Sequence, residues 1–499
     1  MLLLVFFCII LYLVGVIQAA PTIIATNITT SDNVEAPSFT TRTLWTIIFS
    51  SVLTLFACIY SAIHPNIPNP KESGHRYILW RQLSMTIMAL IAPELIVAWA
   101  MRQWFSAHQV TRRFEKSGYP NLIIRPNSEE IDVPATGNCF TRFLLRLPFV
   151  RLLILLAKGP LSVLVFLWRF LCAPMRCFAN WIEPEPSESD LEDYTWTQTH
   201  SFFVLMGGFM LYVDGKPYLT LRPDYILKLI QDKCIDVPTL TAKQIRDRSK
   251  GNAISKALVV LQVAWFVLQL ITRAIYHLET TQLEVGTLAF AVLSFLTYAM
   301  WWDKPLDVRC SHPVYWKSTE SMPEDHIDTS DTDEFAPLPI ARSIFELMGF
   351  PRIPTSQKLQ VPTFDGSITL DGSNRKVLRL AAMLMATIFG GVHCMAWFFA
   401  FPTHQEQMLW RISAVATTCT PWLCWSLYSD SEVTHSVLQH FPNPLKYVVW
   451  GVYFLIYFAC FALYVPARAV LLVLMFTTLH NLPPDAYKAA SWTSMVPHL

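Results

Sequence analysis

The stretch MALIAPELIVAWA, from Met88 to Ala100, is apolar enough to lie in a lipid bilayer, yet it carries Pro93 and Glu94 side by side near its middle. A membrane helix needs about 20 mostly apolar residues. A charge at the bilayer centre costs about 2.5 to 3.5 kcal/mol on insertion scales. A carboxylate in this position therefore indicates a helix that faces a cavity, a partner or water.

The composition of the whole chain points to a membrane protein. Hydrophobic residues make up 53% of the 499 residues, charged residues only 15%, and the mean hydropathy is +0.36. So much apolar surface cannot be packed into one soluble core. The formal net charge of +1 gives no basic or acidic excess of the kind that would suggest a nucleic-acid partner. We therefore expect an all-α, polytopic helix bundle whose surroundings are the lipid bilayer.

Seven stretches have the length and composition of membrane helices: 43–63, 82–101, 256–276, 283–301, 377–400, 409–428 and 446–474. Basic residues before 256 and after 301 predict that both of these loops are cytoplasmic, because short cytoplasmic loops are enriched in Lys and Arg. If the chain starts in the lumen and crosses twice by residue 101, one further crossing must precede 256. The number of crossings therefore predicts that the segment 143–171, which holds Lys158, is an eighth span.

The first twenty residues are apolar and end in small residues before Pro21, as in a signal peptide. Because this start carries no Lys or Arg, an uncleaved signal anchor is the alternative. The sequon at Asn27 would be glycosylated in the lumen. These features predict an integral membrane protein of the secretory pathway, without distinguishing the plasma membrane from an internal membrane.

The expected organisation follows from these assignments. It comprises the signal segment 1–20, a lumenal segment 21–42, two membrane helices in 43–101, a loop region 102–255, a membrane hairpin 256–301, an acidic and partly disordered cytoplasmic loop 302–376, three final membrane helices in 377–476 and a tail 477–499. Within the loop region, residues 196–213 are too short to cross a bilayer. We interpret that segment as re-entrant or interfacial, with Trp196, His200, Gly207 and Gly208 as its notable residues.

Polar side chains recur on the predicted membrane helices. Gln262, Gln269 and Arg273 share one helix face, and Arg273 and Glu284 lie at the two ends of a short lumenal hairpin, where they could pair. With His393 and Arg411 beside the other short hairpin, the prediction is one buried polar site in the lumenal half of the bundle, formed by Glu94, Arg273, Glu284, His393, Arg411, Gln262 and Gln269. Such a site indicates proton or ion binding, or a structural ion pair that holds helices in register.

Sequence signatures of enzymes are mostly missing. The chain has no HExxH, GxSxG or Walker motif, and His435 and His440 bring no third metal ligand. We therefore predict no metal and no cofactor, and we assign no catalytic residue.

Several blocks carry a resemblance to a known family. They include ALIAPELIVAWAMRQW, WTQTHSFFVLMGGF, TQLEVGTLAFAVLSFLTYAMWWDKPLDV, GGVHCMAWFFAFPTHQEQMLWRIS and LPPDAYKAASWTSMVPHL. Together they resemble a widely expanded family of fungal multi-pass membrane proteins without an established activity. The resemblance implies a shared membrane fold and transfers no catalytic residue. Residues 121–190 lie outside the blocks.

Three functional hypotheses remain from the sequence. The polar helix faces favour a transporter or channel-like protein for a small solute or ion. A membrane-embedded enzyme that acts on a lipid or terpenoid-like substrate is the alternative, because acid–base chemistry needs only one or two ionisable groups. A non-catalytic scaffold or receptor, with acidic loops that bind partners, is the third.

Overall fold

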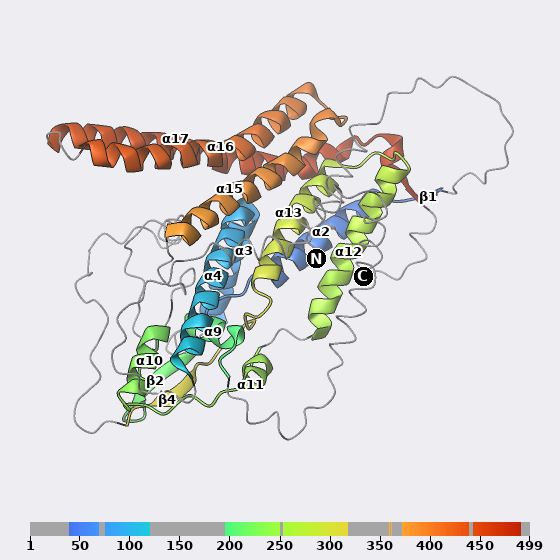
Figure 1. Ribbon diagram of the computed structural model, residues 1–499. Helices are drawn as coiled ribbons and strands as arrows, with labels where there is room; N and C mark the ends of the chain where they lie inside the picture. The colour runs from blue at the N-terminus through green and yellow to red at the C-terminus, as the bar shows by residue number, and fades with distance from the viewer. Residues whose placement is uncertain are drawn as a thin grey trace, which may run out of the picture.

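The computed structural model describes residues 39–68, 75–119, 195–249, 253–317, 359, 361, 372–438 and 443–490. The described chain is mostly helical, with a small mixed sheet at one end of the helices and a two-stranded ribbon at the other (Figure 1). The predicted signal segment, Asn27 and the possible span at 143–171 lie outside the described residues, as does nearly all of the acidic loop.

The elements follow one another in this order: β1 Phe39–Thr41, α2 Leu44–Ala62, α3 His75–Ile91, α4 Pro93–Ser117, α9 Gln198–Leu205, β2 Phe209–Val213, β3 Lys216–Thr220, α10 Pro223–Gln231, α11 Ala242–Asp247, α12 Ala253–Ile275, α13 Gln282–Met300, β4 His312–Tyr315, α15 Gly372–Cys394, α16 His404–Leu438, α17 Asn443–Thr477 and β5 Lys488–Ala490. Short 3-10 turns at Met395–Phe398, Thr478–His480 and Pro484–Tyr487 complete the order.

Four helical stretches are long and apolar enough to cross a membrane: Leu258–Ile275, Gln282–Met300, Leu380–Phe398 and Phe454–His480. They agree with four of the predicted spans. The bent pair α3 and α4 would make a fifth if it counts as one span, and α2 is a shorter apolar helix. The larger count of seven to eight spans is not confirmed by the described residues.

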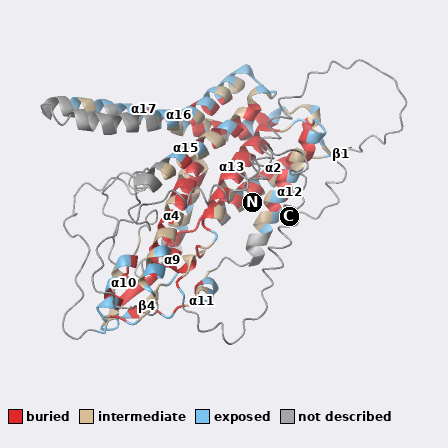
Figure 2. Cartoon of the chain, viewed as in Figure 1, coloured by how far each residue is buried: buried red, intermediate tan, exposed pale blue. Residues whose placement is uncertain are grey.

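Helix α13 is the centre of the bundle. It packs against α2, α4, α15 and α17, and most of its side chains are buried, as the red ribbon in Figure 2 shows. Small residues allow this close packing. A Cβ atom added to Gly286 would lie 2.3 Å from the end of the Met475 side chain on α17, so this methionine packs into the space beside the glycine.

The ribbon of β1 and β5 closes the end of the bundle where the chain's tail returns. Thr40 pairs with Ala489 in antiparallel register. Arg273, at the end of α12, donates to the carbonyl oxygens of Glu279 (3.1 Å), Asp485 (3.1 Å) and Lys488 (2.7 Å). We call this part of the bundle the tail end, defined by Arg42, Arg273, Glu284 and residues 485–490.

A small α/β domain occupies the opposite end. Strand β2 lies in the middle of a sheet of order β3-β2-β4, antiparallel to β3 and parallel to β4. Asp214 (φ 51°) and Gly215 (φ 73°) form the tight turn between β2 and β3, where a left-handed backbone is required. Helix α4 runs on from the bundle into this domain, and the ring of Phe114 stacks on Trp196 with centroids 3.6 Å apart.

The segment Trp196–Gly208 therefore differs from its prediction. Trp196, His200, Phe202 and Phe203 are buried inside the small domain, where α9 packs on α4. The His200 ring closes a capping box with Thr197 at the start of α9, and its Nε2 lies 2.6 Å from the carbonyl oxygen of Leu240. Burial lowers the pKa of His200, so the imidazole is neutral and structural. An interfacial helix would instead leave its aromatic face outward.

Helices α3 and α4 are two arms of a hairpin that meet inside the bundle. They bend by 111° at Ala92, and both arms reach the small-domain end (Figure 1). In the middle of α3, Arg81 donates to the carbonyl oxygen of Asn66 (2.9 Å), while Gln103 in the middle of α4 accepts from Lys304 (2.8 Å). Lys304 also donates to the side chain of Asn66 (3.3 Å), so both arms pass beside the loop that follows α2.

This hairpin corrects the predicted crossing pattern. The sequence argument treats 82–101 as one straight span that crosses to the far side, and it therefore needs an extra crossing at 143–171. Because α3 and α4 return to the end from which they start, residue 119 lies on the same side as residues 63–68. The parity no longer requires an eighth span.

We expect single cysteines to report this geometry in sealed membranes. On a cysteine-free background, Glu115→Cys and Lys216→Cys should react with a membrane-impermeant maleimide from one side, and His277→Cys from the opposite side. All three positions are exposed. Reaction of Glu115→Cys and His277→Cys from the same side would contradict the hairpin.

Candidate functional site

The break between α3 and α4 lies in the middle of the bundle and results directly from Pro93. Proline lacks an N–H and restricts the residue before it, and Ala92 adopts φ −141° and ψ 70°, which is outside the helical region. Helix α3 ends at Ile91 and α4 begins at Pro93. The last carbonyl groups of one helix and the first N–H groups of the next therefore point into the protein interior.

Arg468 on α17 binds the carbonyl end of α3. Its Nε donates to the carbonyl oxygen of Ile91 (2.8 Å) and its Nη2 to that of Leu90 (3.0 Å). The guanidinium is fully buried and lies over the rings of Phe389 (4.1 Å) and Phe290 (5.5 Å). A helix C-terminus carries partial negative charge and an aromatic face attracts cations, so both kinds of contact stabilise this buried charge.

Glu94 lies on the other side of the break, in the first turn of α4. The helix N-terminus carries partial positive charge, which favours a carboxylate there. The hydroxyl of Tyr464 donates to Glu94 Oε1, and Tyr464 lies one helical turn before Arg468 on α17. One face of α17 thus supplies a donor for the carboxylate and a cation for the freed carbonyl groups. The break is held by complementary charges at both of its helix ends.

His393 on α15 completes the surroundings of this break. It is fully buried, and its Nδ1 donates to the carbonyl oxygen of Phe389 (2.9 Å), so Nε2 is the unprotonated nitrogen of the neutral ring. The ring of Phe389 contacts both His393, with centroids 4.7 Å apart, and Arg468. Trp410 on α16 donates to the carbonyl oxygen of His393 (3.0 Å) and fixes this part of α15.

Three buried polar atoms around the break have no hydrogen-bond partner among the described residues: Glu94 Oε2, Arg468 Nη1 and His393 Nε2. They are an acceptor, a donor and an imidazole nitrogen. Buried polar atoms in proteins are nearly always hydrogen-bonded, so a group of three calls for an explanation. We define the break site as Glu94, Tyr464, Arg468 and His393.

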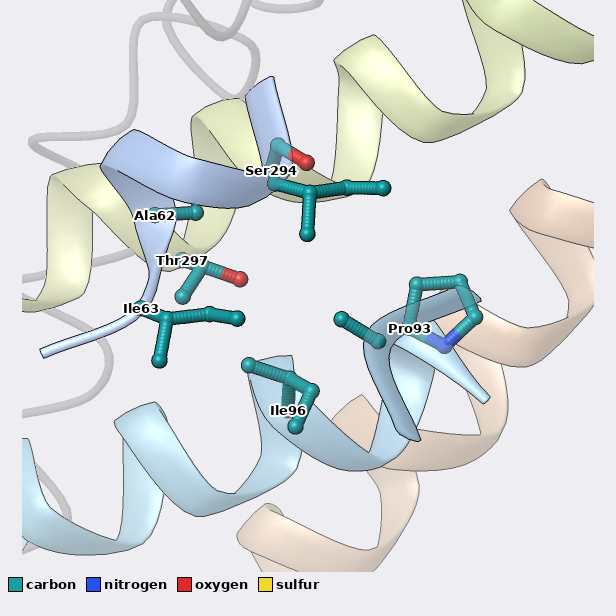
Figure 3. A pocket seen from close by; sticks show the side chains of 8 residues that line it. Ala62, Ile63, Pro93, Ile96, Ser294 and Thr297 are labelled. Carbon is teal, nitrogen blue, oxygen red and sulfur yellow. The ribbon is translucent and has the colours of Figure 1, made fainter. Parts of the chain in front are cut away.

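A small cavity lies beside the break. It has a volume of about 10 Å³, which is room for about one water molecule. Figure 3 shows Pro93 and Ile96 of α4, Ala62 and Ile63 from the end of α2, and Ser294 and Thr297 of α13 around it. The lining is mostly apolar, with the two hydroxyl groups of α13 as its polar members.

The predicted polar residues are divided among separate places and do not form one site. Glu94 and His393 lie at the break site, where Arg468 rather than Arg273 is the cation beside Glu94. Arg411 donates to the carbonyl oxygen of Trp397 (2.9 Å) within its own hairpin. Gln262 donates to Thr54 on α2 (3.1 Å), and Gln269 is half-buried on α12.

Glu284 belongs to an ion pair at the tail end. Arg42 Nη1 donates to its Oε1 (2.6 Å) and Arg42 Nη2 to its Oε2 (3.2 Å), while Thr281 supplies a backbone N–H (2.8 Å). Arg42 also donates to the carbonyl oxygen of Ala486 (2.7 Å). Arg273 lies near enough to interact electrostatically with Glu284, although its hydrogen bonds go to backbone carbonyl groups. A carboxylate with this many donors is a structural anchor.

Lys304 forms a third charged centre, at the small-domain end. Its Nζ donates to the carbonyl oxygen of His64 (2.6 Å) and to the side chains of Gln103 (2.8 Å) and Asn66 (3.3 Å). The rings of Trp301 and Trp99 lie 4.6 and 5.0 Å from it. Burial and the nearby Arg81 lower the pKa of Lys304. The three acceptors favour the charged form, because an ammonium group has three N–H bonds to donate.

Sequence reasoning missed Arg468, Tyr464 and Arg42, and it read Lys304 only as a loop cation. One signal was available for α17: Arg468 is a charged residue within an otherwise apolar stretch of 27 residues, and Tyr464 is one turn away. Arg42 has no such signal, because it directly precedes a predicted span, where basic residues are ordinary.

The paired charges at the break predict a non-additive effect on stability. Arg468→Met should lower the free energy of unfolding by about 3 to 5 kcal/mol, because it leaves the Glu94 carboxylate buried without its cation. Adding Glu94→Gln should recover part of this loss. Denaturant titration of the purified protein in detergent measures the four corners of the cycle. Arg411→Met, at a half-buried arginine, is the control, and strict additivity would contradict the pairing.

The comparisons with known proteins concern the family alone. No curated protein and no solved structure matches the chain. A family model matches residues 8–123, 176–325 and 366–499, which leaves out the segment 143–171 and includes all four residues of the break site. The chain belongs to this family, a family of unknown function (DUF8562).

Proposed function

We propose that the protein is a multi-pass membrane transporter or channel-like protein that moves protons, alone or coupled to a small solute, with Glu94 as the proton-binding group. The supporting observation is the buried carboxylate at the start of a half-helix. One of its oxygens accepts from Tyr464 and the other has no partner among the described residues. Ionisable groups inside a membrane are rare, and ion and proton pathways are among the features that they mark.

The broken helix supports the same proposal. In many transporters, the ends of discontinuous helices meet near the bilayer midplane, where their opposite partial charges hold ions and charged groups. Here α3 presents carbonyl oxygens to Arg468 and α4 presents its positive end to Glu94. A cavity of about 10 Å³, room for about one water, adjoins Pro93 at the break, and its lining includes none of the four break-site residues.

A proton on Glu94 changes the balance of charge at the break. Ionised Glu94 compensates Arg468, and both are buried. When Glu94 is protonated, Arg468 keeps only the carbonyl oxygens and the aromatic faces, so the attraction between α4 and α17 weakens. The two arms of the hairpin meet at this point, so protonation favours movement of the α3–α4 apex relative to α17. This is the step by which a proton is linked to a change in access.

The alternatives have less support. A lipid-modifying enzyme needs room for its substrate, and drug-sized ligands already occupy cavities of roughly 300 to 1,000 Å³. The cavity at the break site is about 10 Å³. The acidic loops that motivate a scaffold lie mostly outside the described residues. Glu284, the other candidate carboxylate, is held by Arg42 and Thr281 and is therefore a poor proton carrier.

Proton flux into proteoliposomes tests the proposal. With a pH-sensitive dye inside and an imposed membrane potential, the wild type should acidify the lumen, and Glu94→Gln should reduce the flux at least about tenfold, because glutamine cannot titrate. Tyr464→Phe should retain flux with an altered pH dependence, since it removes a donor that favours the ionised carboxylate.

Glu406→Gln is the matched control, because Glu406 only caps the start of α16 through Thr403. It should leave the flux unchanged. Thermal unfolding must show that each variant is folded. Equal flux through the wild type and a folded Glu94→Gln protein would overturn the assignment of Glu94.

A further inference from the structure

Basic side chains gather where α12 and α13 leave the bundle at the small-domain end. Lys243 and Arg246 lie on α11, Arg248 follows it, and Arg309 and His312 come after α13. We call these five residues the basic strip. Ile245 is fully buried and anchors α11, which leaves the basic residues of α11 on the outer face (Figure 2).

Two contacts join the segments that form the strip. The Oγ of Ser249 accepts from the backbone N–H of Leu306 (2.8 Å), which fastens the end of α11 to the turn after α13. Arg248 Nη2 donates to His312 Nδ1 (3.2 Å). Burial and the Arg248 guanidinium hold the pKa of His312 below its usual value, so the imidazole accepts this bond as a neutral ring. The strip is therefore one surface built from two chain segments.

The charge of this surface is positive. Asp247 lies among the basic residues, and Asp307 contacts Arg309 at 3.5 Å, an exposed pair that contributes little. Four Lys or Arg residues thus stand against three carboxylates, those of Asp247, Asp303 and Asp307. An exposed surface of this sign attracts anions.

The position of the basic strip along the bundle indicates which anions it meets. The apolar stretch of α12 begins at Leu258, shortly after Arg248, and that of α13 ends at Met300, shortly before Arg309. Trp302, between them, is 59% exposed, and exposed tryptophans of membrane proteins collect at the headgroup level. Clusters of basic residues directly beside membrane helices attract anionic lipids.

We propose that the basic strip binds the headgroup of an anionic phospholipid. The lipid phosphate and carboxylate meet Arg246, Arg248 and Arg309, and the acyl chains lie along the exposed apolar face of α12, which carries Leu258, Leu261 and Leu268. This surface is separate from the break site, so the proposal does not depend on proton transport.

Native mass spectrometry of the full chain in detergent tests this binding. Phosphatidylserine is titrated against the wild type and against Arg246→Gln/Arg248→Gln/Arg309→Gln, with phosphatidylcholine as the neutral lipid. We expect the first bound phosphatidylserine to weaken about fivefold for each basic side chain removed. Phosphatidylcholine binding should not change, and added salt should weaken the wild-type preference.

Lys216→Gln/Lys228→Gln/Lys233→Gln is the matched control. It removes the same number of charges from exposed positions of the small domain that lie away from α11 and α12. An equal loss in this control, or no loss in the strip variant, would overturn the proposal. Inorganic phosphate is the third arm: if it displaces phosphatidylserine at equal concentration, the strip is a site for soluble phosphate and the lipid assignment fails.

Discussion

The interaction on which the rest of the bundle depends is the binding of Arg468 to the carbonyl end of α3. A helix that stops inside a protein leaves its last carbonyl groups without intrahelical partners, and Pro93 forces this stop in the middle of an apolar stretch. Arg468 satisfies two of these groups from a helix that is almost four hundred residues away in sequence. Without a buried donor at this point, the carbonyl groups that the break frees would be left without hydrogen bonds inside the bundle.

The hairpin determines where the other charged groups lie. Because both of its arms return to the same end, Lys304 can hold the loop after α2 and the middle of α4 together. Because no arm reaches the opposite end, that end is closed by the chain's tail, which Arg42 and Arg273 fasten to α12 and α13. The three charged centres therefore differ in how their polar atoms are hydrogen-bonded. The charged groups at the tail end and at Lys304 each have several hydrogen-bond partners, whereas at the break site Glu94 Oε2, Arg468 Nη1 and His393 Nε2 have none among the described residues.

Local composition predicted much of the fold. The runs that became α12, α13, α15 and α17 are long and apolar, and their assignment required no knowledge of partners. The bend at Pro93 was visible as a proline, but its angle was not, because a proline can kink a continuing helix or end it. Because residues 82–101 were interpreted as one straight span, the count of crossings required an eighth span. The small domain was equally hidden, since the residues from Trp196 to Gly208 have the same apolar character in a protein core as in a membrane.

The candidate site, too, could be predicted from the sequence only in part. Glu94 is conspicuous because a carboxylate in an apolar run needs a reason, but its partners lie on α17 and α15, and single-sequence spacing relates residues only within one helix. The prediction of one site that holds both Glu94 and Arg273 assumed that residues at the same level in the membrane lie together, whereas Arg273 binds the returning tail. Within one element, spacing does relate residues: Tyr464 and Arg468 are one turn apart and share a face of α17, although neither was predicted as a site residue.

The position of Glu94 answers why an apolar stretch carries a carboxylate. In a continuous membrane helix, Glu94 would interrupt the lipid-facing surface at a cost that nothing nearby offsets. At the first turn of a new helix, it meets the positive end of α4, the hydroxyl of Tyr464 and the charge of Arg468. Each of these favours the ionised form, and burial opposes it. Glu284 has a donor for each of its oxygens, whereas Glu94 Oε2 has no partner among the described residues. This contrast is the reason why the proposed function places the proton on Glu94.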